Sequence, residues 1–327
     1  MKKFFAVLLV VAFAAPAFAQ DDVKINPFLR MKMVNNTTTK TNTVDFDLSG
    51  VQISKKFGDN FSATVTPGFY RDPMVTNAAN TALNFQLIEA FFAINDITKN
   101  YGDYKIGLVA GQYESAFYKM EQYYQPFRFI YKPLDSKLIT DNYLDLGVMA
   151  GTSFLDDAIN VSLGYLSGIS TNNDNINAGG AHLVAAFFPF KKFGEGLKEL
   201  SMTFNLKTIF RNTARSNYNL LVGYKYAGFA TSLEYLKTYS SARANDIQAT
   251  SFGASYDICT MLQALARWDY SDNKAAANQF DHLFLIGMNT KWFDSKLQAA
   301  LTYDQEYNPQ AKINVAKRIM VATQVSL

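Results

Sequence analysis

The sequence predicts an all-β protein, a transmembrane antiparallel β-barrel of about 16 strands, and three observations lead to this fold class. Segments of about ten residues alternate between apolar and polar side chains, and the connections between these segments alternate between long and short. The 327-residue chain is also rich in aromatic residues, with 27 Phe and 19 Tyr, at a mean hydropathy of only −0.07. Beyond the first 20 residues, no apolar run reaches the length of a spanning helix.

The alternation has the period of a β-strand, in which successive side chains point to opposite faces. Near the C-terminus, for example, Leu297, Ala299 and Leu301 share one face, whereas Gln298 and Thr302 share the other. In water, a sheet of this extent needs a second layer, and no segment with a helical period supplies one. In a bilayer, lipid covers the apolar face and closure of the barrel removes the sheet edges.

Sixteen such segments are recognised along the chain. Their expected spans are 23–33, 44–54, 61–70, 82–94, 104–113, 142–153, 159–168, 180–189, 200–210, 217–227, 229–239, 248–258, 262–271, 282–292, 296–306 and 315–327. The fourth is expected to contain a β-bulge, because its apolar face shifts phase between Phe85 and Ile88.

The connections have the rhythm of outer-membrane barrels, with long external loops and short periplasmic turns. Those after odd segments are long and polar: 35–43, 71–81, 169–179, 271–279 and 305–314. Those after even segments are mostly short: 55–60, 155–158, 227–228, 259–261 and 293–295. Residues 95–103 and 190–199 are longer turns, and the second is expected to hold a helical turn. This order predicts periplasmic termini, with Trp268 and Tyr270 toward the external interface.

The first residues predict export. Lys2 and Lys3 precede an apolar run over 4–15, and Ala17 and Ala19 occupy the positions that a signal peptidase reads. We therefore expect a signal peptide at 1–19, a single barrel domain at 20–327 and location in a bacterial outer membrane. The alternative is a retained membrane anchor, for which the run is short. A lipoprotein is disfavoured because no Cys lies near the cleavage site.

Charge and cysteine content exclude several other classes of protein. Without Lys2 and Lys3 the formal net charge of +3 falls to +1, which gives no strong bias toward nucleic acid. Cys259 is the single cysteine of the chain, so no intrachain disulfide is possible. No phosphate-binding loop or metal-binding motif is present, and neither a cofactor nor a metal is expected.

Two segments resemble known families. The run LNFQLIEAFFAINDI, a turn and then YKIGLVAGQYESAFYKMEQYYQPFRFIYKPL resemble the phosphate-selective-type porins, in which a strand pair leads into a Gly-Gln-x-x-x-Pro-Phe segment. Here that segment begins at Gly111, and Ala116 replaces the Pro. The last strand resembles the C-terminal recognition strand of outer-membrane proteins, which the barrel-assembly machinery reads. Val325 and Leu327 carry this signal, although the family pattern usually ends in Phe.

The connection at 114–141 is the longest, at about 28 residues, and it is rich in aromatic residues that would not remain solvated at a surface. It is the third external loop, and general porins fold their third loop into the channel. We therefore expect it to fold inward, so that its charges form the constriction. These charges are Glu114, Lys119, Glu121, Arg128 and Lys132. The alternative is an external lid or a contact between subunits of a trimer.

Alternation also assigns charged residues to the pore wall. The basic ones are Lys24, Arg30, Lys32, Lys105, Lys207, Lys225, Arg267 and Arg318, and the acidic ones are Asp45, Asp47, Asp145, Glu234, Asp269 and Asp304. Because a narrow pore focuses the electric field, eight bases against six acids predict a weak anion preference.

The predicted function is therefore a water-filled channel for passive diffusion of small hydrophilic solutes and ions, and not an enzyme. Sixteen strands enclose an aqueous lumen, whereas eight strands would be filled by side chains. One alternative is a channel specific for a phosphate-like anion or an oligosaccharide. Others are a surface adhesin or a hydrolase at the barrel rim, for which His282 with Asp281, Ser271 and Asp272 is the only candidate group. The porin resemblance implies a homotrimer, and the expected surroundings are outer-membrane lipid.

Overall fold

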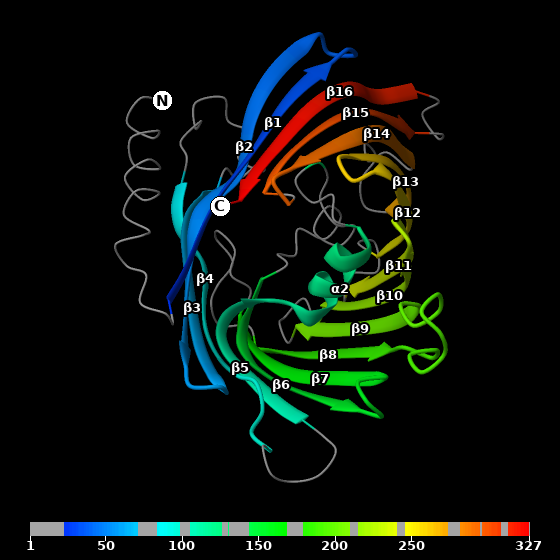
Figure 1. The fold of residues 1–327 in the computed structure, drawn as a ribbon. Coiled ribbons are helices and arrows are strands. Elements are labelled where there is room, and N and C mark those ends of the chain that lie inside the picture. The colour runs from blue at the N-terminus through cyan, green and yellow to red at the C-terminus, as the bar shows by residue number, and fades with distance from the viewer. Residues whose placement is uncertain are drawn as a thin grey trace.

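The computed structural model describes residues 23–70, 84–98, 105–125, 130, 144–168, 179–209, 215–240, 246–273, 282–294, 296–308 and 313–326. These residues form sixteen strands in one closed antiparallel barrel, in which each strand pairs with its sequence neighbours and β1 pairs with β16 (Figure 1). The predicted fold class is confirmed. The predicted signal peptide at 1–19 lies outside the described residues.

The strands match the predicted segments one for one, most of them within two residues at each end. Their bounds are β1 Val23–Asn36, β2 Thr41–Phe57, β3 Phe61–Tyr70, β4 Asn84–Ile94, β5 Lys105–Glu114, β6 Leu144–Phe154, β7 Ile159–Gly168, β8 Gly180–Phe187, β9 Ser201–Ile209, β10 Arg215–Tyr226, β11 Phe229–Ser240, β12 Ile247–Cys259, β13 Leu262–Asn273, β14 His282–Trp292, β15 Leu297–Asn308 and β16 Ile313–Ser326.

Two connections predicted as long loops are shorter than expected, because the strands beside them are longer. β1 and β2 continue to Asn36 and Thr41, so the predicted loop 35–43 is reduced to a four-residue turn at 37–40. Similarly, β15 and β16 leave only 309–312 of the predicted 305–314. The polar strand ends bond to one another: Asn35 Nδ2 donates to Asn42 Oδ1 at 2.7 Å, and Thr37 N donates to Lys317 O at 2.8 Å. These residues are polar on both faces, so they show no alternation.

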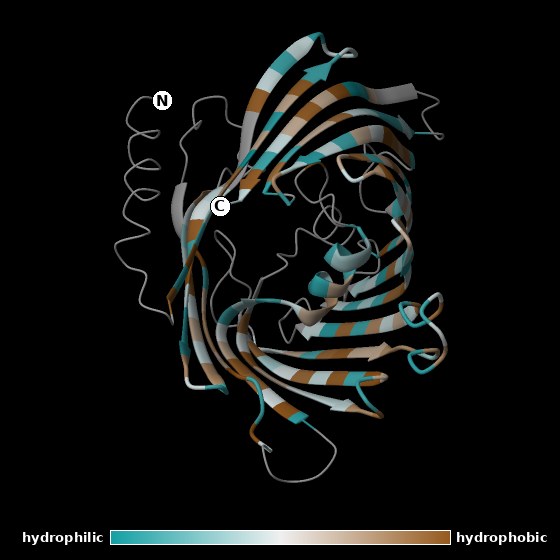
Figure 2. Cartoon of the chain, in the orientation of Figure 1, coloured by the Kyte–Doolittle hydropathy of each residue, from teal (hydrophilic) through white to brown (hydrophobic). Residues whose placement is uncertain are grey.

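Hydrophobic and hydrophilic residues alternate along many of the strands (Figure 2), and the exposed fractions show that they alternate across the barrel wall as the sequence predicts. In β15, Leu301 points outward and is 58% exposed, whereas Thr302 and Asp304 point inward and are 2% and 0% exposed. In β7, Leu163 and Tyr165 point outward and are exposed. An apolar outward face around a largely polar inward face is the pattern of a barrel that lipid surrounds.

The bulge predicted in β4 is present. The register between β3 and β4 shifts after Thr66, which pairs with Glu89, while Pro67 pairs with Leu87. Ile88 is therefore the extra residue, and it is buried, at 4% exposure, although the sequence pattern placed it on the apolar outward face with Phe92. Beyond the bulge, Glu89 points inward and accepts hydrogen bonds from Gln52 (3.1 Å) and Thr66 (2.9 Å).

The turns after even strands are short, as predicted, and several use left-handed backbone. Ala227 and Gly228 join β10 to β11 with φ angles of 48° and 81°, the geometry of a two-residue hairpin turn. The longer 190–199 connection does not form the helix turn that the sequence suggested. It contains separate turns, in which Phe193 N donates to Phe190 O (2.8 Å) and Leu197 N donates to Gly194 O (3.2 Å).

Helix α2 (Ala116–Tyr124) lies inside the ring of strands and belongs to the connection between β5 and β6 (Figure 1). The side chain of Ser115 caps it by accepting a hydrogen bond from Tyr118 N at 3.1 Å. Among the described residues, no helix is long and apolar enough to cross a membrane. We call residues 115–125 together with Ile130 the inner segment.

Candidate functional site

The inner segment packs one face of α2 against the inside of the barrel wall. Phe117 and Tyr124 form an apolar cluster with Val184 of β8 and Leu221 of β10, and all four side chains are at most 4% exposed. The ring of Tyr124 lies directly on Gly223, where an added Cβ would stand only 2.2 Å from a ring carbon. Glycine at 223 therefore provides the close approach that seats the helix.

Two tyrosines anchor the end of α2 near the β8–β9 connection. Tyr123 Oη donates to Glu199 Oε2 at 2.8 Å, and Tyr124 Oη donates to the Glu199 carbonyl at 3.0 Å. Burial is the main reason why the pKa of each phenol rises to about 12, and the bond to Glu199 contributes for Tyr123. Both therefore stay protonated donors at neutral pH. Lys225 lies over the Tyr123 ring at 4.4 Å, as a cation–π contact.

After the helix, hydrogen bonds of Gln125 join the inner segment to two further strands. Its amide nitrogen donates to Ser232 Oγ on β11, and its amide oxygen accepts from Arg267 Nη1 on β13 at 3.3 Å. Arg267 also forms an ion pair with Asp269 at 2.8 Å, and the two side chains are 6% and 2% exposed. Because both charges are buried, this ion pair fixes the position of Arg267 and therefore of the Gln125 amide that it contacts.

Ile130 extends the contact further around the wall. It is fully buried in a cluster contributed by β13 to β16. The members of that cluster are Leu265, Leu283, Leu285, Ala300, Met320 and Ala322. From the opposite side of the β1–β16 seam, Lys32 Nζ donates to the Ile130 carbonyl at 3.5 Å. The inner segment thus starts at β5 and contacts the wall from β8 to β16 and β1.

A buried ladder of polar side chains crosses four neighbouring strands on the inward face. His182 Nε2 and Asn205 Oδ1 are 2.6 Å apart, Asn205 Nδ2 donates to Asn219 Oδ1 at 3.2 Å, and Asn219 Nδ2 donates to Glu234 Oε1 at 3.1 Å. All four side chains are at most 5% exposed. The ladder holds Glu234 within the wall, so this carboxylate is not a freely accessible pore charge.

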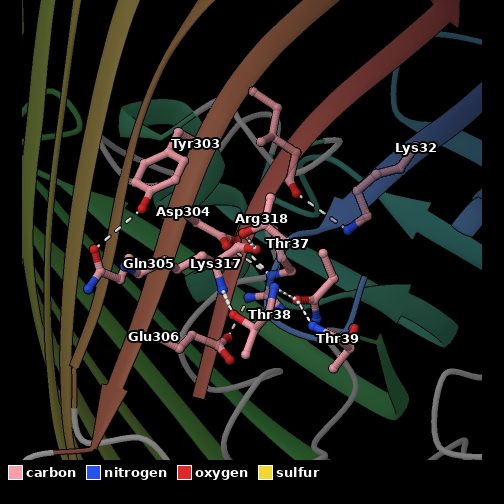
Figure 3. Close-up of polar contacts among 12 residues, drawn as sticks. Lys32, Thr37, Thr38, Thr39, Tyr303, Asp304, Gln305, Glu306, Lys317 and Arg318 are labelled. Atoms are coloured by element: carbon pink, nitrogen blue, oxygen red, sulfur yellow. Dashed lines mark hydrogen bonds and ion pairs between the residues drawn. The ribbon is translucent and has the colours of Figure 1, made fainter. Parts of the chain in front are cut away.

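A second charged group lies on β15 and β16 (Figure 3). Arg318 donates to Asp304 Oδ1 at 2.8 Å and to Glu306 Oε1 at 2.5 Å. One base therefore faces two acids. Sequence alternation identified Arg318 and Asp304 but omitted Glu306, which falls at the end of the predicted strand.

The predicted constriction residues separate into three groups. Lys119 is exposed on the face of α2 that points away from the packed wall, whereas Glu121 is 3% exposed. Glu114 is partly buried and accepts from Gln122 Nε2 at 3.0 Å. Arg128 and Lys132 lie outside the described residues.

The predicted wall residues differ in how accessible they are. Lys24, Lys105 and Lys225 are exposed, whereas Lys207 is only 5% exposed. Arg30 donates to Gln324 at 3.0 Å across the β1–β16 seam. The side chains of Asp45, Asp47 and Asp145 lie outside what the structure describes, as does Leu327, while Val325 pairs with both Leu29 and Leu297 where the barrel closes.

Sequence reasoning missed Glu89 and the ladder residues His182, Asn205 and Asn219. Parity within β8, β9 and β10 would have placed the last three on the inward face with Lys207, but a search restricted to charged residues passes over amides. Glu89 lies on the face opposite Phe92 beyond the predicted bulge, so parity would also have placed it on the inward face, but the predicted wall charges omitted it.

Two members of the predicted rim-hydrolase group, His282 and Ser271, lie on opposite faces of the wall, and Asp281 lies outside the described residues. His282 lies beside the outward-facing rings of Tyr270 and Trp268, with centroid distances of 5.2 and 6.1 Å. Ser271 is buried on the opposite, inward face of β13, at 3% exposure. A nucleophile and its base must lie within hydrogen-bond reach, and here the barrel wall separates them.

The comparisons with known proteins identify the fold. The sequence matches no protein-family model and no curated protein. Among solved structures, the chain is similar to OmpF of Salmonella typhi in complex with daunomycin, at 11% identity and a TM-score of 0.65 over 93% of this chain and 97% of that chain. It is also similar to the outer-membrane channel DcaP of Acinetobacter baumannii, at 11% identity and a TM-score of 0.61 over 94% of this chain and 97% of that chain. A third similar structure is OmpT of Vibrio cholerae, an outer-membrane protein, at 12% identity and a TM-score of 0.61 over 93% of this chain and 97% of that chain. The chain therefore has the 16-strand barrel fold of these outer-membrane proteins.

Proposed function

We propose that this protein is an outer-membrane channel through which small hydrophilic solutes and ions diffuse passively. The observation that carries the proposal is the position of the inner segment. It folds into the interior of a closed 16-strand barrel and contacts only part of the inward face of the wall. A barrel of this width encloses water, and a loop fixed inside it narrows the passage. An adhesin would instead require its functional loops to lie on the surface.

Several features accompany this proposal. The outward apolar face would contact lipid, the segment 1–19 would be removed during export, and both termini would be periplasmic because the strand number is even. The C-terminal strand would engage the assembly machinery, and a homotrimer is proposed because one similar OmpT structure is described as a trimer form. The resemblance of 83–134 to phosphate-selective-type porins remains a prediction, since no family match supports it.

Liposome swelling tests the proposed function. Liposomes that contain the purified, folded protein should swell in solutions of small sugars and amino acids, with rates that fall as the solutes become larger. If the liposomes swell with only one solute and not with others of equal size, the protein is a substrate-specific channel and not a passive one.

The lipid contact is tested by two adjacent residues of β7. Leu163→Arg places a cation on the outward face, where it costs about 2–4 kcal/mol near the bilayer midplane, whereas Ser162→Arg places it in the aqueous lumen. We expect Leu163→Arg to reduce assembly severely and Ser162→Arg to have little effect, measured by heat-modifiable gel mobility. Equal assembly of both variants would mean that lipid does not surround this wall.

Ion preference is tested at Lys119, the exposed cation of α2. Glu89 and Glu306 offset the basic excess that the sequence predicted for the wall. We propose a weak anion preference instead because Lys24, Lys105 and Lys119 are exposed. The inward carboxylates of Glu234, Asp269 and Asp304 are at most 2% exposed. Lys119→Glu should shift the reversal potential in a salt gradient toward cations, because the field is focused at a constriction. The matched change Lys296→Glu, in an exposed turn, should leave it unchanged. An unchanged reversal potential in Lys119→Glu would show that this residue does not line the ion passage.

A further inference from the structure

The packing of α2 leaves a recess on the other side of the lumen. A cavity of about 390 Å³ lies between the first turn of α2 and the inward face of β4 to β7. The wall contributes Phe91, Lys105, Tyr113 and Glu114, and α2 contributes Lys119. These side chains come from the segments before and within the helix, so the recess exists only because the inner segment is folded inward.

Small residues create the space. Gly107 of β5, Gly151 of β6 and Ser162 of β7 all line the recess. A Cβ at Gly151 would stand 2.9 Å from Ser162 Oγ, and one at Gly107 would stand 3.3 Å from the Asn95 carbonyl oxygen. Larger side chains at the two glycine positions would distort the wall of the recess.

The lining combines aromatic rings with hydroxyl groups. Phe91 and Tyr113 bring rings to the recess, and Tyr113 is itself 3% exposed and therefore held in place by its surroundings. Ser153 and Ser162 add hydroxyl groups from the neighbouring strands. An aromatic wall with a few polar groups is typical of sites that bind a flat organic molecule.

The accessible charges of the recess are mainly positive. Lys105 and Lys119 are both exposed, and within the described part of the chain neither ammonium group forms an ion pair. Glu114 contributes one carboxylate, but its Oε1 accepts a hydrogen bond from Gln122 at 3.0 Å. Asp96, which interacts with Lys105, is held mainly by Thr98, whose bonds lower the pKa of this carboxyl.

From this arrangement we infer that the recess is a binding site for small organic anions, in which a carboxylate or phosphate group meets Lys119, a flat apolar part of the solute lies against Phe91 or Tyr113, and Lys105, farther along β5, adds positive potential to the same recess. This inference rests on the proposed function, because it names the class of solute that the channel would hold during passage. Such a site would concentrate these solutes in the lumen and slow the flow of small ions while it is occupied.

Anthranilate, a fluorescent ring-bearing carboxylate, provides a direct probe when it is titrated into the purified full-length barrel in detergent. We expect saturable binding, and at least about tenfold weaker binding of the neutral isostere anthranilamide, because the charge-assisted contacts are lost. The double variant Lys105→Gln/Lys119→Gln should weaken anthranilate binding by a similar factor. The matched control Lys56→Gln, on the inward face of β2 and outside the recess, should change it less than about twofold.

A second variant and a competitor separate the possible outcomes. Ser162→Phe fills the recess without changing its charge and should also abolish anthranilate binding. In the wild type, phenyl phosphate should compete with anthranilate more strongly than inorganic phosphate does. Equal affinity for anthranilate in the wild type and in both variants would overturn the assignment, and equal competition by inorganic phosphate would overturn its organic part. If the barrel binds anthranilate but never conducts ions, the proposed channel function is contradicted, whereas the binding site is supported.

Discussion

Arg267→Met is expected to lower the free energy of unfolding by about 3–5 kcal/mol, because it leaves the carboxylate of Asp269 buried without its ion-pair partner. The two side chains are 6% and 2% exposed and their charged atoms are 2.8 Å apart. The same substitution removes the bond from Arg267 to Gln125, so the inner segment should also be held less firmly. Equilibrium unfolding in urea with lipid vesicles would measure the loss.

Two comparisons make this result specific. Gln263→Met removes a neutral inward side chain from the same strand, which accepts a hydrogen bond from Asn289, so the loss should be about 1 kcal/mol. The double variant Arg267→Met/Asp269→Leu removes both charges and should recover much of the stability. If Arg267→Met and Gln263→Met lower the free energy of unfolding equally, the buried pair does not have the role assigned to it.

Tyr124→Ala is expected to release α2 from the wall and to raise the single-channel conductance. The ring is 1% exposed and contacts Gly223, Val184 and Leu221, and loss of a buried aromatic side chain costs about 3–5 kcal/mol. Tyr123→Ala removes a neighbouring ring that is 41% exposed, so its effect on the seating of α2 should be smaller.

The contact with Gly223 can be tested by a double-mutant cycle. Gly223→Leu should displace the helix by itself, because the new side chain overlaps the ring of Tyr124. In the Tyr124→Ala background the same substitution should do little further harm, since the ring is absent. Additive effects of the two substitutions, or a wild-type conductance in Tyr124→Ala, would show that this contact does not hold the inner segment in the passage.

The sequence is sufficient to predict the barrel because one physical rule governs every strand. A wall between lipid and water requires side chains of alternating polarity, so β13 and β15 could be placed and their faces assigned from parity alone. The rule fails where both sides of a strand are in water. The ends of β1 and β2 are of this kind: Asn35 and Asn42 bond to each other, but their polar sequence resembles a loop.

Local irregularities limit the prediction of the lumen more severely. A single extra residue, Ile88, reverses the parity of β4 and brings Glu89 inward. Within the predicted constriction, the helical period of 116–124 decides which charges are accessible, so that Glu121 is buried while Lys119 is exposed. The positions of charged residues in the sequence do not reveal that Lys207 and Glu234 are buried in the wall.

The central claim is that the barrel is open to ions and narrowed by the inner segment, and single-channel recording in a planar bilayer tests it most directly. The purified, folded protein should insert in discrete steps of ohmic conductance at low voltage. The Tyr124→Ala variant should show larger steps under the same conditions. A correctly folded barrel that inserts but remains silent would contradict the account.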